Sequence, residues 1–414
     1  KENYTMPFSF STAISGLRAS SDSLSVTGNN IANANTTAFK SSTISFQDVF
    51  SDQSSSRQIG NGVQVSATPT NFSQGVLSDS ASSTSAAIQG TGFFVIGDEQ
   101  STYTYTRAGD FTIDRDGFLV TPGGGKVQGY GATNGVIDIN APVASIKVPL
   151  GEMIPPVTTT EATIHMNLNS ADATGAEFHA PVRVYDTKGV SHTLDLVFVK
   201  QANGSYNASA TLDNNAAQAN GGANVNFTFD ANGLLTAPAS LTITPDQTQL
   251  GGAALPTIEI NLRRLNADGS PGSPNVTNFA APSAVSSAEQ NGFSAGTLSS
   301  LTYSADRNGT IYTVFSNGQT RPFAQLAIAT FPSQHGLRHL GGNAFGETVE
   351  SGQASIGRAT TGGRGSVVGS SLEQSNVDIA TEFTDLIVAQ RSYQANSRVI
   401  TTINQTLQDL LTII

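Results

Sequence analysis

Two apolar stripes at helical spacing, one near each end of the chain, are the features that most constrain its fold. Toward the C-terminus, apolar residues recur at alternating steps of three and four, which predicts an α-helix with a heptad seam. These positions are Leu386, Ala389, Tyr393, Ile400, Ile403, Leu407, Leu410 and Ile414, and Asn396 alone interrupts them. A stripe of this length is expected to need a partner that shields it from water.

The opening of the chain offers such a partner. The same spacing passes through Phe10, Ile14, Leu17, Ser21, Leu24, Gly28 and Ile31. Ser21 and Gly28 are small, so another helix could approach closely there, at a cost in intrinsic helix propensity. The residues alone leave two readings open: the two ends form a coiled-coil stalk within one molecule, or they assemble between molecules.

Composition and charge narrow the class of protein. With 414 residues, the chain is long enough for two or three domains, each with a sizeable core. The net charge of −11 argues against nucleic acid or an anionic membrane surface as partner, because both select basic patches. The 41 Gly residues and the 12% of charged residues favour a β-rich, extracellular protein.

Cysteine usage and hydropathy exclude several kinds of site. The sequence has no Cys, so disulfides, thiolate zinc sites and cysteine nucleophiles are not expected. No apolar run is long enough to predict a membrane span, and the first residues lack the basic and apolar regions of a Sec-type signal peptide. Residues 1–5 precede Met6, which has the character of a natural start, and are expected to be a remnant of an upstream start.

Between the two stripes the periodicity is that of short strands. Alternating runs are broken by Gly and by Asp-Gly-type turns such as "DRDG" (114–117), "DTKG" (186–189) and "DANG" (230–233), which predicts hairpins. Composition shifts toward Ala, Asn and Pro around 148–160 and 270–290 mark two crossings into an inserted domain. The polar stretch 51–62 predicts a flexible connector.

The expected fold is therefore mainly β with long α-helical termini, in several domains. The predicted divisions are a terminal helical domain (1–35 and 372–414), a connector (36–75), a proximal β domain (76–147 and 284–371) and an inserted outer β domain (148–283).

The search for catalytic, cofactor and metal sites predicts none. "TPGGGKV" lacks the first Gly and the Ser or Thr of a phosphate loop, so a turn is the better interpretation. His335 and His339 have the spacing of zinc ligands on a helix, but the Glu of a zinc-protease motif is missing and Gly336 disfavours a helix. Asp110, Asp114 and Asp116 do not fit the spacing of a calcium loop.

Three segments together resemble the bacterial flagellar rod and hook axial proteins, and among them the hook proteins. "SFSTAISGLRASSDSLSVTGNNIANANTTAFKSS" resembles their N-terminal signature, including the Phe39–Lys40 pair. "GTGFFVIG" with "YTRAGDFTIDRDGFLV" is similar to their proximal β domain, and "SSLEQSNVDIATEFTDLIVAQRSYQANSRVITT" to their C-terminal helix. The resemblance spans nearly the whole chain.

The middle of the chain separates hook proteins from their relatives. A distal rod protein lacks an insertion as large as 148–283, and the hook-filament junction protein differs before "AQRSYQANSRVI". Both remain alternatives, with a secreted β-rich adhesin less favoured because it would not need matching apolar stripes. Tyr206 stands where the outer domain usually has Trp, and Gln405 stands at a position expected to be acidic.

The resemblance implies a structural, non-enzymatic subunit that polymerises into a curved, flexible tube and transmits torque from motor to filament. Its partners would be further copies of itself, the flagellar rod, hook cap and hook-filament junction proteins, and the type III export apparatus, which would deliver it to the outside without a cleavable signal. Phe10 and Ile14 fit the export element of the family. The predicted assembly interface comprises Phe10, Ile14, Leu17, Leu24, Ile31, Ile379, Leu386, Tyr393, Ile400, Ile403, Leu407 and Leu410.

Overall fold

The computed structural model of the chain describes residues 8–49, 60–97, 103–133, 135–222, 224–247, 250, 253–265, 271–304 and 306–413. The chain divides into two compact units, each described by itself below. Unit 1 comprises residues 1–150, 300–314 and 320–414, and unit 2 comprises residues 151–299 and 315–319.

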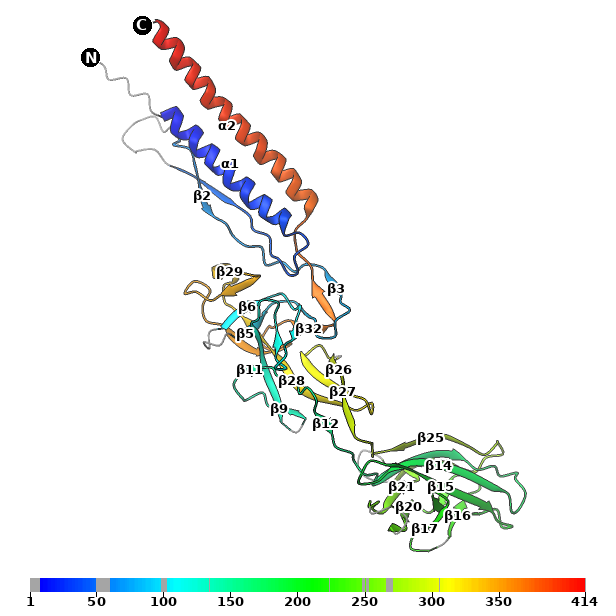
Figure 1. The fold of residues 1–414 in the computed structure, drawn as a ribbon. Coiled ribbons are helices and arrows are strands. Elements are labelled where there is room, and N and C mark those ends of the chain that lie inside the picture. Colours follow the sequence, from blue (N-terminus) through cyan, green and yellow to red (C-terminus); the bar gives the residue numbers. More distant parts are fainter. Residues whose placement is uncertain are drawn as a thin grey trace. The chain divides into compact units, whose positions relative to one another are not determined.

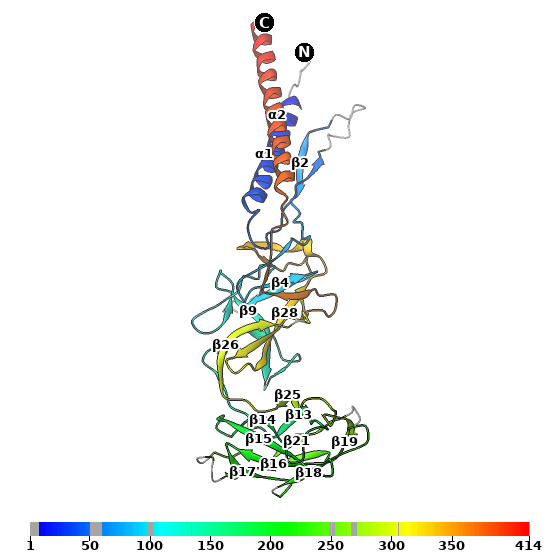
Figure 2. The same cartoon turned by 90° about the vertical axis from the view of Figure 1, so that its right-hand side faces the viewer.

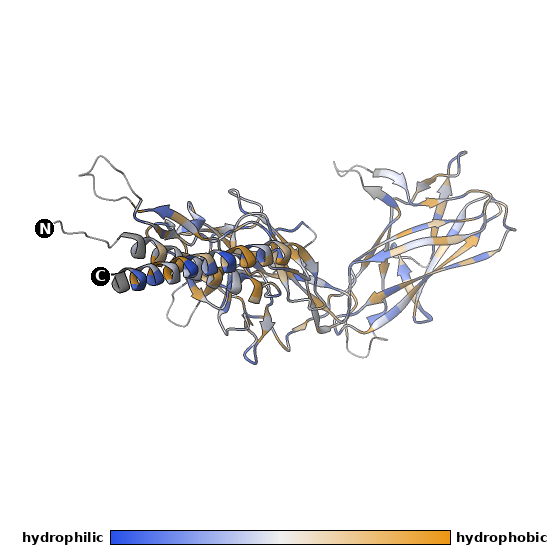
Figure 3. Ribbon diagram, turned by 90° about the horizontal axis from the view of Figure 1, so that it is seen from above, coloured by the Kyte–Doolittle hydropathy of each residue, from blue (hydrophilic) through white to orange (hydrophobic). Residues whose placement is uncertain are grey.

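Two long helices form one part of unit 1. Helix α1 spans Phe8–Ala32 and helix α2 spans Ile379–Ile413. They run antiparallel beside each other (Figures 1 and 2). The predicted fold class, mainly β with paired helical termini, is confirmed. Along α2, hydrophobic and hydrophilic segments alternate (Figure 3), as expected of a helix that carries an apolar stripe.

Local hydrogen bonds explain where α2 begins. Asp378 Oδ1 accepts from the backbone N–H groups of Ala380 (2.9 Å) and Thr381 (3.1 Å), which is the geometry of a helix N-cap.

The hairpin of β1 (Ser45–Asp48) and β2 (Val63–Ala67) packs beside α1. Most of the predicted flexible connector at 51–62 lies outside the described residues.

The remainder of unit 1 is a β domain. Its main sheet contains the order β27-β28-β9-β5-β6-β30-β29. The strands are β3 (Leu77–Asp79), β4 (Ala86–Gln89), β5 (Phe93–Gly97), β6 (Tyr103–Thr106), β7 (Thr112–Ile113), β8 (Leu119–Val120), β9 (Lys126–Thr133), β10 (Val136–Ile137), β11 (Ala144–Ser145), β27 (Thr310–Phe315), β28 (Thr320–Thr330), β29 (Arg338–Gly341), β30 (Ala344–Gly346), β31 (Ser355–Arg358), β32 (Ser366–Gly369) and β33 (Ser371–Glu373). A 3-10 helix, η2, spans Gln334–Gly336.

Aromatic side chains fill the core of this β domain. Phe93 packs edge to face on Phe331 and Phe345, with ring centroids 5.9 and 5.7 Å apart, and Tyr105 packs on Phe331 at 4.8 Å. Gly109 lies against a neighbouring segment, since a Cβ atom there would lie 1.6 Å from the carbonyl oxygen of Ala86. The Gly of "YTRAGDF" is therefore required by close packing.

Unit 2 is a second β structure with its own core. Its main sheet has the order β14-β15-β16-β17-β20-β21-β13-β24, and β25 pairs with β13. The strands are β12 (Met153–Ile154), β13 (Glu161–Asn167), β14 (Glu177–Tyr185), β15 (Ser191–Lys200), β16 (Tyr206–Leu212), β17 (Asn215–Ala219), β18 (Val225–Phe229), β19 (Leu235–Ala237), β20 (Ser240–Thr244), β21 (Ile258–Asn261), β22 (Arg263–Leu265), β23 (Pro271–Pro274), β24 (Val276–Thr277) and β25 (Ala284–Gln290); β26 (Gly296–Tyr303) begins in unit 2 and ends in unit 1.

Strand pairing extends unit 2 beyond the composition shift in the sequence. Strand β25 pairs antiparallel with β13, with Gln290 opposite Ala162. The predicted division after residue 283 would separate these two strands, because composition marks a loop and carries no information on the partner of the next strand. In the core of this unit, the buried Tyr206 hydroxyl donates to the carbonyl oxygen of Asn169 (2.6 Å).

The three Asp-X-X-Gly segments are turns, as predicted. In each, the final Gly has a positive φ, from 76° to 88°. In each, the first Asp accepts backbone N–H groups from two and four residues further along the chain. These Asp side chains are therefore occupied in holding turns.

Candidate assembly surface

Helix α1 packs against α2 through small residues. Its buried residues are Ala13, Ala19, Ser20, Thr27 and Asn30. Gly16 also faces α2, because a Cβ atom there would lie 2.9 Å from the side-chain amide of Asn396. We call the set Gly16, Ser20, Ser23, Thr27 and Asn30, together with the α2 residues opposite, the small-residue seam. Small side chains let the two backbones approach closely.

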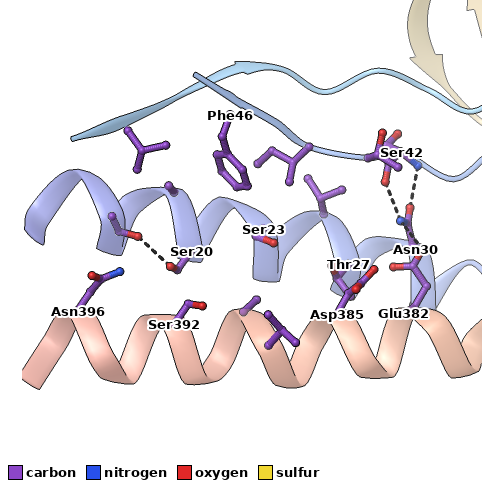
Figure 4. Close-up of a pocket in the computed structure, with 18 residues that line it drawn as sticks. Ser20, Ser23, Thr27, Asn30, Ser42, Phe46, Glu382, Asp385, Ser392 and Asn396 are labelled. Atoms are coloured by element: carbon purple, nitrogen blue, oxygen red, sulfur yellow. Dashed lines mark hydrogen bonds between the residues drawn. The ribbon is translucent and has the colours of Figure 1, made fainter. Parts of the chain in front are cut away.

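The α2 side of the small-residue seam is polar. It consists of Glu382, Asp385, Ala389, Ser392 and Asn396, again at steps of three and four. Figure 4 shows the four polar side chains of this set pointing toward α1. At one end of the seam, Asn30 Nδ2 donates to Glu382 Oε1 (3.0 Å) and to the carbonyl oxygen of Ser42 (2.8 Å). At the other end, Gly16 lies opposite Asn396, which fixes the antiparallel register.

A groove of about 490 Å³ runs along this seam on the side of the β1–β2 hairpin. Phe46 of the hairpin and Val388 of α2 contribute apolar walls, and Glu382 and Asp385 contribute carboxylates. Burial raises the pKa of the Glu382 carboxyl, and the neighbouring Asp385 adds to this, whereas the hydrogen bond from Asn30 opposes it. The hairpin is tied to α1 by the Val63 N–H, which donates to Ser15 Oγ (3.2 Å).

Ala389 belongs to both the predicted apolar stripe and the small-residue seam, and the other described stripe residues lie outside the seam. On α1, Ile14 is 41% exposed, and Leu17, Leu24 and Ile31 are half-buried. On α2, the exposed members are Ile379, Tyr393 and Leu407, and the half-buried members are Leu386, Ile400 and Ile403. Phe10 and Leu410 lie outside the residues whose side chains the structure describes. Within one chain, therefore, the described part of these stripes is left incompletely covered.

Helical geometry places both stripes on the same side of the helix pair. At 3.6 residues per turn, Leu17 and Leu24 point away from Ser15, which contacts the hairpin. On the antiparallel partner, Leu386 and Tyr393 each follow a seam position by one residue, and this rotation turns them to the side that the hairpin leaves open. We call this combined surface, formed by the described stripe residues of both helices other than the buried Ala389, the apolar face.

Large apolar residues outside the predicted stripes extend this surface. Phe383 and Ile387 follow Ile379 at steps of four and are 48% and 51% exposed. Val388 and Val399 are also exposed, on another side of α2. A search for a single heptad seam passes over all four, although reading forward from Ile379 in steps of four would have found the first two.

The structure places the other singled-out polar residues in structural roles. His339 Nε2 lies 2.8 Å from Thr70 Oγ1, and the ring of His335 packs on Phe72 with centroids 6.2 Å apart. Among the residues that the structure describes, no cluster of three or more His, Asp or Glu side chains could hold a metal ion. Neither helix, over its described length, is long and apolar enough to cross a membrane.

Four family models match the chain in succession. They are the flagella basal body rod protein (residues 10–40), the flagellar hook protein FlgE/F/G D1 domain (87–165), the flagellar basal body protein FlaE D2 domain (156–293) and the flagellar basal body rod FlgEFG protein C-terminal region (368–413). The small-residue seam and the apolar face thus lie within the first and last of these regions.

Curated relatives match over almost their entire length. The flagellar hook protein FlgE of Salmonella typhimurium is 33% identical, over 97% of this chain and 99% of the relative. The FlgE proteins of Borreliella burgdorferi and Escherichia coli K12 are each 32% identical, over 97% of this chain and 98% and 99% of the relatives. Because the similarity runs from one terminal helix through both β units to the other, the chain belongs to the flagellar hook protein family.

Proposed function

We propose that this chain is the structural subunit of a bacterial flagellar hook and that it polymerises through the apolar face of its paired terminal helices. The observation that carries this proposal is that α1 and α2 already pair through the small-residue seam and still leave large apolar side chains exposed. A second copy of the chain is the natural occupant, since hook relatives match this chain over their whole length.

The same proposal covers the finer features of the assembly. Terminal helices from many copies would line the inner wall of a curved tube, the β domain of unit 1 would form the next layer, and the inserted domain, unit 2, would face solvent. Such a tube acts as a universal joint between motor and filament. The rod, the hook cap and the hook-filament junction proteins would meet its two ends, and Phe10 with Ile14 would serve export through the type III apparatus to the cell exterior.

A matched pair of substitutions on α2 tests the role of the apolar face. Phe383→Asp places a carboxylate in the middle of the exposed apolar residues, whereas Thr384→Asp places the same charge on the next, polar and exposed position. We expect Phe383→Asp to block polymerisation, because burying an unpaired charge between subunits costs several kcal/mol. Thr384→Asp should polymerise close to normally, and neither variant should lower the unfolding temperature of the monomer substantially.

Sedimentation of polymers and electron microscopy give the readout. The unchanged chain should yield short curved tubes, which a secreted adhesin would not form. Tubes of normal yield from Phe383→Asp would refute the proposed interface. Equal loss in both variants would show that added negative charge, rather than the lost apolar contact, prevents assembly.

A further inference from the structure

A buried cluster of charged side chains in unit 1 lies where segments from both ends of the chain meet. Lys40 lies between α1 and β1, Arg107 follows β6, and Glu373 is the last residue of β33, shortly before α2. Lys40 Nζ lies 2.5 Å from Glu373 Oε1, and Arg107 Nη1 lies 3.4 Å from Glu373 Oε2. The exposed fractions of the Lys40, Arg107 and Glu373 side chains are 0%, 3% and 0%.

Backbone groups tie the same segments together around Glu373. The N–H of Gly75 donates to Glu373 Oε1 (2.9 Å), and the N–H of Ala38 donates to the Glu373 carbonyl oxygen (2.7 Å). Lys40 Nζ also donates to the carbonyl oxygen of Ser73 (2.8 Å). The segment after α1, the segment before β3 and the lead-in to α2 therefore converge on one carboxylate.

Arg107 anchors that carboxylate to the β domain. Its Nη2 donates to the carbonyl oxygen of Gly90 (2.6 Å), and its guanidinium lies over the ring of Phe93, 5.6 Å from the centroid. Both contacts lie within unit 1, around the start of β5. Arg107 thus links Glu373, and with it the lead-in to α2, to the segment at the start of β5.

The cluster holds two cations and one carboxylate, so removing different members leaves different net charges in the protein interior. One carboxylate faces two buried cations, and burial lowers the pKa of both Lys40 and Arg107 while Glu373 opposes the shift. Removing Lys40 would leave a neutral pair of Arg107 and Glu373. Removing the charge of Glu373 would leave two like charges buried together, which is strongly destabilising.

We propose that Glu373 is the positioning residue of the two chain ends: Lys40 docks on a carboxylate that Arg107 already holds on the β domain, and this docking fixes the segment after α1 beside the start of α2. The proposal rests on the proposed function, because the ends fixed in this way carry the apolar face. Lys40, the second residue of the Phe39–Lys40 pair, would then act within one chain, before the subunits contact each other.

Hydrogen exchange of the full-length monomer, followed by mass spectrometry of peptides, tests the proposal. Peptides covering 36–42 and 71–76 report on docking, and a peptide covering 93–97 in β5 is the internal reference. In the first two, Glu373→Gln should speed exchange about a hundredfold or more. Lys40→Met should speed it by a smaller factor, about tenfold, because the docking contact is lost but the remaining pair of Arg107 and Glu373 is neutral. The double variant should fall between them, because only one unpaired cation remains.

The double variant shows whether the effects of the two substitutions arise from coupled charges or from independent hydrogen bonds. If Lys40→Met with Glu373→Gln exchanges fastest of the three, the effects add and the proposal is overturned. It is also overturned if the 93–97 peptide loses protection to the same degree, since Glu373 would then hold the β domain together rather than position the ends. If Glu373→Gln does not fold, Lys40→Met is compared with Lys40→Glu, which should lose protection, and equal exchange in the two overturns the proposal.

Failure of this proposal and failure of the proposed function give different results. Normal polymers from Phe383→Asp, together with the expected exchange order, would reject the assembly surface and leave the role of Glu373 intact. Additive exchange effects, together with blocked polymerisation of Phe383→Asp, would reject the role of Glu373 and leave the assembly surface intact.

Discussion

Two glycines of α1 provide a direct test of how the terminal helices pair. A Cβ atom at Gly16 would lie 2.9 Å from the side-chain nitrogen of Asn396, whereas a Cβ atom at Gly28 would have no neighbour within 4 Å. Neither glycine has a positive φ, so Ala fits the backbone at both positions. Gly16→Ala and Gly28→Ala therefore make the same chemical change in one helix and differ only in what the new methyl group meets.

The expected free energies follow from this difference. Replacing Gly by Ala within a helix stabilises it by about 0.8–1 kcal/mol. Gly28→Ala should gain this in full, which corresponds to roughly four- to fivefold slower hydrogen exchange of α1 amides. Gly16→Ala should show little or none of this stabilisation. The new methyl group would push the flexible Asn396 side chain away from α1 and out of the small-residue seam.

Native-state hydrogen exchange of α1 measures both effects, and Asn396→Ala serves as the control. Combined with Asn396→Ala, Gly16→Ala should recover the stabilisation, whereas the effect of Gly28→Ala should be unchanged by the second substitution. If Gly16→Ala alone slows exchange as much as Gly28→Ala does, then α1 and α2 do not pack through the seam, and the derivation of the apolar face is wrong with it.

Two further predictions concern unit 2. Tyr206→Phe should lower its stability by about 1 kcal/mol, measured as a fall in the calorimetric unfolding temperature, because the hydroxyl no longer donates to Asn169. Burial disfavours the charged form of His192, but the Asp213 and Asp186 carboxylates, 2.6 and 3.3 Å from its ring nitrogens, outweigh this and raise its pKa, while the pKa values of both Asp residues are lowered. The raised pKa of His192 stabilises unit 2 fully below about pH 6.5, and this contribution is lost as the pH rises through the pKa of the folded state. The lowered pKa values of the two Asp residues stabilise unit 2 fully above about pH 4, and their contribution is lost as the pH falls. The stability of unit 2 should therefore peak between about pH 4 and pH 6.5. His192→Gln should flatten the alkaline side of this profile, and an unchanged alkaline side would contradict the assignment.

Features with a local physical cause were predictable from the sequence. Apolar spacing predicted helices at both ends, because a helix that buries one face must repeat its apolar residues every three or four positions. The segments at 114–117, 186–189 and 230–233 were predicted as turns, since each supplies an Asp that caps its own backbone and a Gly that adopts positive φ.

Features that depend on distant partners were not predictable in this way. Nothing in the sequence around Ala284–Gln290 indicates that this strand pairs with β13, more than a hundred residues earlier in the chain. Lys40 and Glu373 are separated by most of the chain, and neither carries a local signal that it will be buried. Lys40 was singled out only because it lies in a segment that resembles the family. Nothing in the sequence connected Lys40 with Glu373.

The small-residue seam was missed for a more informative reason. Hydrophobic periodicity finds the face of a helix that gains most from leaving water. On α1 that face is separate from the one that contacts α2, and on α2 the two faces share only Ala389. Ser20, Thr27 and Asn30 bury little apolar surface, so the pairing of the helices within one chain contributes little hydrophobic free energy. More hydrophobic free energy would come from burying the apolar face, and this requires another surface to cover Ile14, Phe383 and their neighbours. A helix pair built in this way is only marginally stable alone and would be strongly stabilised in the proposed polymer, because the polymer buries the apolar face that the single chain leaves exposed.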